Sequence, residues 1–120
     1  MCGGAAGSCG ACWSFAATGA IEGAWKLFGP NHTLGSYSEQ QLIDCSPDNN
    51  GCNGGNPTYA FRYVKSNGGI DSEEDYPYKG APGGCDARAS RRHEATVSAA
   101  CNVPPRDEPA LLKAVRTPSP

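Results

Sequence analysis

Residues 9–28 of this 120-residue chain read CGACWSFAATGAIEGAWKLF, a two-cysteine motif that leads directly into a segment with helical periodicity. Apolar side chains recur there at steps of three and four residues, and no proline occurs before Pro30. This pattern predicts an amphipathic helix from Cys12 to about Phe28. Residues 7–10 are turn-like, so Cys12 falls within the first helical turn.

Cys12 therefore occupies a position at which a helix stabilises negative charge. The first turn gathers backbone N–H groups that lack helical partners, together with the positive end of the helix dipole. Both favour the thiolate, which is the attacking form of a cysteine nucleophile. We take Cys12 as the candidate nucleophile, which still requires a general base.

Capping residues mark two further helices. Residues 38–41, Ser-Glu-Gln-Gln, match a capping box and predict a short helix that ends near Asp44. Asn56 and Pro57 fit the N-cap and first helical position of a third helix, and Gly68 fits its end.

Less regular segments make up the rest of the chain. Residues 46–55 are almost all turn formers and predict an irregular loop. Residues 70–84 are expected to be extended or turn-rich, and we interpret the acidic run that begins at Asp71 as solvated surface. Residues 95–103 predict a strand, and residues 107–115 predict a helix.

The charge balance disfavours several classes of partner. Ten basic residues against twelve acidic ones give a formal charge of −2, without the one-signed field that attracts nucleic acid or anionic lipid. No apolar stretch approaches the roughly 18 residues that a membrane span needs. We therefore expect no nucleic-acid partner and no membrane partner.

The seven cysteines suggest disulfides plus at least one further thiol, as in a secreted or endolysosomal protein. Asn31 begins an N-x-[ST] sequon and is a glycosylation candidate. Cys9 and Cys12 also have the spacing of a redox motif, or of half a zinc site with Cys45 and Cys52. We disfavour both alternatives, because no strand precedes Cys9 and the gap between Cys45 and Cys52 is too long for a common zinc pair. We expect no metal and no cofactor.

Several motifs in order carry a resemblance to a known family. Residues 9–15 have the form C-G-x-C-W-x-F, residues 37–45 read YSEQQLIDC, and residues 50–55 read NGCNGG. With residues 59–78 they resemble the papain-like (clan CA) cysteine peptidases, most closely the cathepsin L-like branch. The resemblance covers roughly residues 7–115.

The resemblance implies an α+β papain-like fold in the full enzyme. This chain would be mainly its α-helical, disulfide-braced left domain with irregular loops. Residues 1–103 would form that left domain, which carries the nucleophile, and residues 104–120 would begin the right, β-barrel domain, here truncated.

The resemblance also implies a set of site residues. Cys12 would be the nucleophile, with a thiol that stays free, and two disulfides would brace the domain. Peptide substrate would lie along a groove at two glycines and reach a pocket formed in part by the next two residues. The implied disulfides are Cys9–Cys52 and Cys45–Cys85, and the implied substrate residues are Gly54, Gly55, Asn56 and Pro57.

The sequence departs from the family pattern at the oxyanion position and lacks a visible base. Ala6 stands where the family has a glutamine that donates to the oxyanion, and we favour a truncated start as the reason. We interpret His32 and His93 as surface histidines, Glu22 as a buried structural partner and Trp25 as core. The catalytic histidine and asparagine are expected to lie beyond this chain.

These features predict a cysteine-type endopeptidase that works through a Cys12 acyl-enzyme, with the 120-residue chain alone inactive. Its partners would be a peptide or protein substrate and the missing C-terminal half, and its location would be lysosomal or extracellular. The alternative is a non-catalytic papain-like homologue that acts as a disulfide-braced binding or structural module. Silicatein-like relatives place serine at the nucleophile position, whereas this chain has cysteine.

Overall fold

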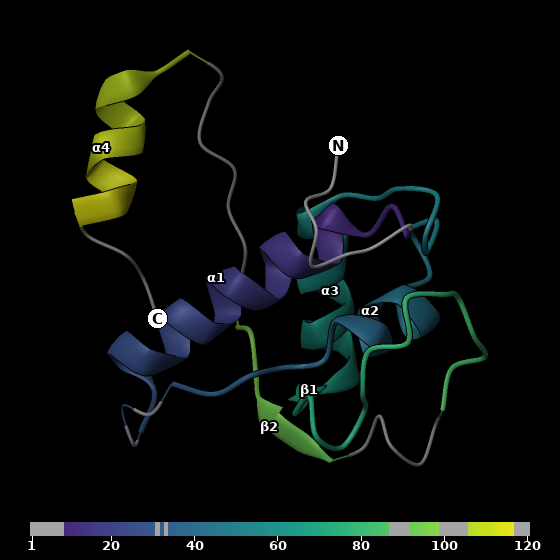
Figure 1. The fold of residues 1–120 in the computed structure, drawn as a ribbon. Helices are drawn as coiled ribbons and strands as arrows, with labels where there is room; N and C mark the ends of the chain where they lie inside the picture. The colour runs from purple at the N-terminus through teal and green to yellow at the C-terminus, as the bar shows by residue number, and fades with distance from the viewer. Residues whose placement is uncertain (1–8, 31, 33, 87–91, 99–105, 117–120) are drawn as a thin grey trace.

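A computed structural model describes residues 9–30, 32, 34–86, 92–98 and 106–116. The elements run in the order α1 (Cys12–Phe28), α2 (Glu39–Cys45), α3 (Pro57–Asn67), β1 (Ile70–Asp71), β2 (His93–Ala95) and α4 (Glu108–Arg116). The helix predicted from Cys12 to Phe28 is thus confirmed at both ends. Long irregular segments connect these elements, as the sequence predicts (Figure 1).

The predicted caps form at α2 and α3. The Ser38 hydroxyl accepts a hydrogen bond from the Gln41 N–H at 2.9 Å, and the Asn56 amide oxygen accepts one from the Thr58 N–H at 2.9 Å. Each bond satisfies a backbone donor that the first turn of a helix leaves without a partner. Gly68 ends α3 with a φ of 81°, in the left-handed region that glycine adopts most readily.

The core lies where α1 packs against α2 and α3 (Figure 1). One face of α1 buries Trp13, Ala17 and Ile21, while Leu42 from α2 and Val64 from α3 are fully buried opposite. The packing follows the three- and four-residue spacing of the apolar side chains in the sequence.

Two disulfides brace this core, and they join the pairs that the resemblance implies. Cys9 is bonded to Cys52 with an S–S distance of 2.05 Å, and Cys45 to Cys85 with one of 2.11 Å. The first connects the residues before α1 to the loop before α3. The second fixes the exit of α2 to the segment that follows residue 78.

The strand predicted at residues 95–103 is largely wrong. The strand present is β2, which ends at Ala95 and pairs antiparallel with β1 through Ile70–Ala95 and Asp71–His93. Residues 96–98 are not in a strand, and residues 99–103 lie outside the described part. The β-branched residues suggested a strand, but β1 offers a partner only as far as Ala95, and an unpaired segment gains no ladder hydrogen bonds.

The helix predicted at residues 107–115 forms as α4, one residue later at each end. The Asp107 carboxylate accepts a hydrogen bond from the Ala110 N–H at 3.0 Å and so caps the first turn. Leu111 and Leu112 are exposed, and Figure 1 shows α4 away from the three packed helices. In the described part of the chain, no helix combines the length and apolar character of a membrane span.

Candidate active site

Cys12 is exposed at the first position of α1. Ala11 precedes it and supplies no side-chain cap, so the backbone donors of the first turn are left to other partners. The expected free thiol is not what the structure shows, because Cys12 is disulfide-bonded. Neither the pairs implied by the resemblance nor the spacing of Cys9 and Cys12 predicted this bond.

A loop lies directly against the start of α1. The Cys9–Cys52 disulfide joins the two, the Gly10 N–H donates to the Cys52 carbonyl at 2.8 Å, and Gly10 forms a parallel bridge with Asn53. The Trp13 indole N–H adds a bond of 2.9 Å to the Gly51 carbonyl. These contacts fix residues 49–56 beside the turn that carries Cys12.

The close approach of this loop explains two of its glycines. A Cβ at Gly10 would lie 2.6 Å from the Cys52 carbonyl oxygen. One at Gly55 would lie 2.5 Å from Asn49 Oδ1 and 2.8 Å from Trp13 Cδ2. Both distances are shorter than packed atoms allow, so the loop can lie this close to α1 only without those side chains.

The predicted substrate residues lie together where this loop enters α3. Gly54 has a φ of 117°, in a region that favours glycine, and a Cβ there would meet nothing within 4 Å. Among the described residues, the backbone N–H and C=O of Gly55 have no hydrogen-bond partner. The side-chain oxygen of Asn56 caps α3. The backbone N–H of Asn56 donates a hydrogen bond to Asn49 Oδ1 at 2.7 Å. Pro57 follows as the first residue of that helix.

The two histidines do not supply a base to Cys12 in this arrangement. His32 is exposed, and its carbonyl accepts a hydrogen bond from Lys26 Nζ at 2.8 Å. The exposed His93 ring lies 3.2 Å from the Asn67 side-chain nitrogen, at the last residue of α3. The loop beside Cys12 leads into the first residue of α3, whereas His93 lies at its last residue. The 11 residues of that helix, a length of about 16 Å, therefore separate His93 from the loop.

Other predicted residues fall as expected or outside the described part. Glu22 is half-buried, and its Oε2 accepts a hydrogen bond from the Tyr37 N–H at 3.0 Å, which is a structural role. Trp25 is partly buried against the core. Ala6, at the oxyanion position, and Asn31, in the sequon, lie outside the described residues.

The redox and zinc interpretations lose their basis. Cys9 is bonded to Cys52 rather than to Cys12, and Cys45 is bonded to Cys85. A thiol held in a disulfide is not available as a zinc ligand. Within the described ranges, no group of three or more potential ligands is arranged to hold a metal ion.

The acidic run was wrongly taken as solvated surface. Asp71 is fully buried, and both of its carboxylate oxygens lack a hydrogen-bond partner. Burial raises its pKa to about 6, an effect that the nearby charges of His93 and Arg92 oppose. Glu73 is half-buried, and its Oε2 accepts a bond of 2.8 Å from the Tyr78 N–H. No periodicity in the sequence signals this burial, because residues on other elements create it.

Comparison with known proteins agrees with this geometry. Residues 5–120 match the family described as "Papain family cysteine protease". The chain is 49% identical to Zingipain-1 of Zingiber officinale over 109 residues, which cover 91% of this chain and 48% of that protein. It is 47% identical to procathepsin L of Rattus norvegicus over 116 residues, which cover 95% of this chain and 34% of that protein.

Solved structures give the same result. The bromelain protease from Ananas comosus, in complex with the E64 inhibitor, superposes with a TM-score of 0.83 at 36% identity, covering 92% of this chain and 50% of that one. The proform of Amb a 11, a cysteine protease and ragweed pollen allergen, gives a TM-score of 0.82 at 43% identity, covering 92% of this chain and 33% of that one. The 120 residues thus span half or less of the relatives they match. The chain belongs to the papain family of cysteine proteases.

Proposed function

We propose that this chain is the nucleophile-bearing part of a cysteine endopeptidase and that Cys12 attacks the scissile carbonyl. The observation that carries the proposal is the placement of an exposed cysteine at the first position of α1, with residues 49–56 fixed alongside it. The names of the relatives, which include a procathepsin L and several plant cysteine proteases, support the same chemistry.

The proposed reaction begins once the disulfide at Cys12 is reduced by a thiol. The thiolate adds to the peptide carbonyl, and the tetrahedral intermediate expels the amine, which takes a proton from an imidazolium. The resulting thioester is then hydrolysed by water, which returns Cys12 to the thiolate and a proton to the imidazole. We assign this histidine, and the asparagine that orients it, to protein outside these 120 residues, because the chain spans only 34–48% of the two relatives described above.

Substrate binding is assigned to the loop that enters α3. An extended peptide has a free N–H and C=O at every second residue on each edge, and Gly55 has both groups without a partner. Gly54 adds open space beside it. Asn56 and Pro57 would border the pocket for the second residue before the scissile bond. Because the Asn56 amide oxygen already caps α3, its amide nitrogen is the group we expect to face that pocket.

We assign the exposed face of α1 to the missing C-terminal half. Small and apolar side chains follow one another along this face from Cys12 onward, and a Cβ at Gly19 or Gly23 would meet nothing within 4 Å. Packing within the described chain therefore does not require glycine at either position, whereas a closely approaching partner would. The exposed residues on this face are Ala16, Gly19, Ala20, Gly23, Ala24 and Leu27.

The remaining assignments follow from this division. We place the boundary between the left and right domains at residues 103 and 104, so that α4, with its exposed Leu111 and Leu112, would belong to the right domain. The two disulfides among the described residues favour a lysosomal or extracellular location. The Cys12 N–H would remain as an oxyanion donor, and alanine at position 6 would cost a factor of about 10²–10³ in rate.

A non-catalytic binding or structural module is the second candidate. The disulfide at Cys12 favours it, because a bonded sulfur cannot attack a carbonyl. In that case the loop at residues 54–57 would hold a peptide without cleaving it.

Reconstitution with the missing half separates the two candidates. The chain would be mixed, under mild reduction, with the C-terminal half of rat procathepsin L and assayed on a fluorogenic dipeptidyl substrate. We expect no turnover by the chain alone and inhibitor-sensitive turnover by the mixture, which Cys12→Ala abolishes. Turnover that survives Cys12→Ala, or a mixture that associates but stays inactive after reduction, would contradict the catalytic assignment.

A further inference from the structure

A buried carboxyl group connects the two helices nearest the candidate site. Glu39 is the first residue of α2 and only 9% exposed. Its Oε2 accepts a hydrogen bond of 2.6 Å from the hydroxyl of Thr18, which is 1% exposed within α1. A glutamate on the first turn of a helix is common at the surface, but here it faces inward.

A second carboxyl group meets the first in the same place. Glu73 follows β1 and runs beside the residues before α2: the Ser38 N–H donates to the Asp71 carbonyl at 3.0 Å, and the Glu73 N–H donates to the Ser36 carbonyl at 2.8 Å. The carboxyl group of Glu73 lies close enough to that of Glu39 to raise the Glu39 pKa. The Glu73 Oε2 accepts the Tyr78 N–H, whereas its Oε1 is buried and has no donor when both groups are ionised. Two carboxylates have only acceptor atoms, so a hydrogen bond between them requires a proton on one. A proton carried by Glu39 gives the Glu73 oxygen the donor that it lacks.

We propose that Glu39 and Glu73 share one proton in the folded protein, and that this pair holds α1, α2 and residues 72–78 together in acid and loosens when it ionises. Ionisation would leave two negative charges in contact in a buried place. The inference concerns the stability of the fold, so it stands whether or not the chain supports peptidase activity.

The burial of Glu39 sets the direction of its pKa shift. Burial raises the pKa of Glu39 to about 7; the Thr18 hydrogen bond opposes that rise, and the Glu73 contact and charge add to it. The folded state therefore binds more protons than the unfolded state between the ordinary glutamate pKa of 4.5 and about 7. Stability is complete below that window and falls as the pH rises through it.

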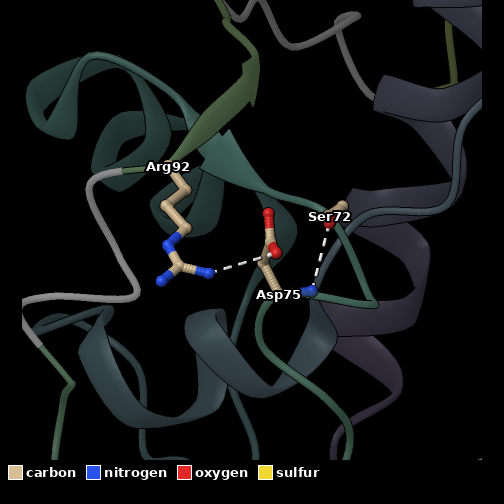
Figure 2. A network of polar contacts seen from close by, with 3 residues as sticks. All are labelled: Ser72, Asp75 and Arg92. Atoms are coloured by element: carbon tan, nitrogen blue, oxygen red, sulfur yellow. Dashed lines mark hydrogen bonds and ion pairs between the residues drawn. The ribbon is translucent and has the colours of Figure 1, made fainter.

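Charged groups around the pair do not relieve this repulsion. Tyr78 faces Glu39 from residues 72–78, and the Glu39 charge adds to burial in raising the tyrosine pKa. Arg92 instead pairs with Asp75 at 3.3 Å, and the Asp75 N–H donates to the Ser72 hydroxyl at 3.1 Å (Figure 2). Among the described residues, neither Glu39 nor Glu73 has a salt-bridge partner.

Loosening of the pair would reach the turn that carries Cys12. The Tyr78 ring packs edge-on against Phe15, with ring centroids 5.3 Å apart. Phe15 lies in α1 one turn after Cys12, and Thr18 lies one turn further. The pair thus holds the segment that contacts both of the first two turns of the nucleophile helix.

The test measures unfolding of the chain by urea at half-unit steps from pH 4.5 to 7.5. In the wild type, we expect the unfolding equilibrium constant to rise by about tenfold per pH unit for each proton released. Asp71 titrates in the same window, so the diagnostic quantity is the difference between variants. Glu39→Gln mimics the protonated acid: its amide can donate to Glu73 and accept from Thr18. We expect the unfolding equilibrium constant of this variant to rise less steeply with pH than that of the wild type, by about one factor of ten per pH unit.

Glu74→Gln is the matched control, because Glu74 is exposed in the same turn. It should keep the wild-type pH dependence. Should Glu39→Gln fail to fold, carboxyl-carbon NMR of the wild type provides an independent test, with the Glu39 signal expected to titrate near pH 7. A Glu39 signal that titrates near pH 4.5, or a Glu39→Gln variant with the wild-type slope, would overturn the proposal.

Discussion

Gly55→Ala tests whether the loop at residues 49–56 is as closely packed on α1 as the structure indicates. The new Cβ would lie 2.5 Å from Asn49 Oδ1 and 2.8 Å from Trp13 Cδ2. Asn49 can rotate away, but it would then lose its 2.7 Å bond to the Asn56 N–H. Trp13 is 4% exposed and bonded to Gly51, so its ring has little room to move.

The expected cost combines these two effects. Overpacking of a buried ring costs about 1–3 kcal/mol, and loss of one hydrogen bond costs about 1 kcal/mol. The reduced freedom of the unfolded chain returns roughly 0.4–1 kcal/mol. We therefore expect Gly55→Ala to lower the free energy of unfolding by about 2 kcal/mol.

The assay is urea unfolding followed by the fluorescence of Trp13 and Trp25. Gly84→Ala is the matched control, because Gly84 is exposed and a Cβ there meets nothing within 4 Å. The double variant Asn49→Ala/Gly55→Ala should cost about 1 kcal/mol less than the sum of its single changes, since both remove the same hydrogen bond. Equal stability of Gly55→Ala and Gly84→Ala, or full additivity in the double variant, would refute the reasoning.

Three further changes test other parts of the structure. Leu42→Ala empties a fully buried position and should destabilise the chain by about 2–5 kcal/mol in urea unfolding, and a loss below about 1 kcal/mol would count against the packing described. Gly23→Ala, in open space on α1, should stabilise the isolated chain by about 0.5–1 kcal/mol yet weaken its association with a C-terminal half in a pull-down titration, and unchanged association would count against the assigned face. Burial raises the pKa of Asp71 to about 6, so the folded state holds this proton more tightly than the unfolded state does. The stability that Asp71 contributes to the fold is therefore greatest below pH 4 and falls as the pH rises to 6. Asp71→Asn should remove about 3 kcal/mol of that pH dependence, and urea midpoints at pH 4 and 7 that still differ as in the wild type would contradict this assignment.

Local signals explain why the helices could be predicted from the sequence. The spacing of apolar residues after Cys12, the capping hydroxyl of Ser38 and the left-handed Gly68 each act within a few residues of their own element. Such features depend little on the rest of the fold, so the bounds of α1 and α3 follow from them.

Features that depend on distant residues could not be predicted in the same way. Pairing with Ile70 decides where β2 lies, so the propensity of residues 96–98 was a poor guide. Glu73 is held inward by the hydrogen bond that its Oε2 accepts from the Tyr78 N–H, and no spacing rule in the sequence signals that contact. The pairs Cys9–Cys52 and Cys45–Cys85 were predicted from the family resemblance and not from the spacing of the cysteines. The bond at Cys12 was predicted neither from the resemblance nor from local sequence signals.

Selective alkylation of Cys12 tests the central assignment most directly. The chain would be treated at pH 6 with a mild thiol and an epoxysuccinyl label, and then mapped by mass spectrometry. We predict that Cys12 is labelled only after reduction, and faster than a cysteine in an unstructured control peptide, while Cys9–Cys52 and Cys45–Cys85 stay bonded. Labelling no faster than that of the control peptide, or labelling at other cysteines first, would contradict the assignment of Cys12 as the nucleophile.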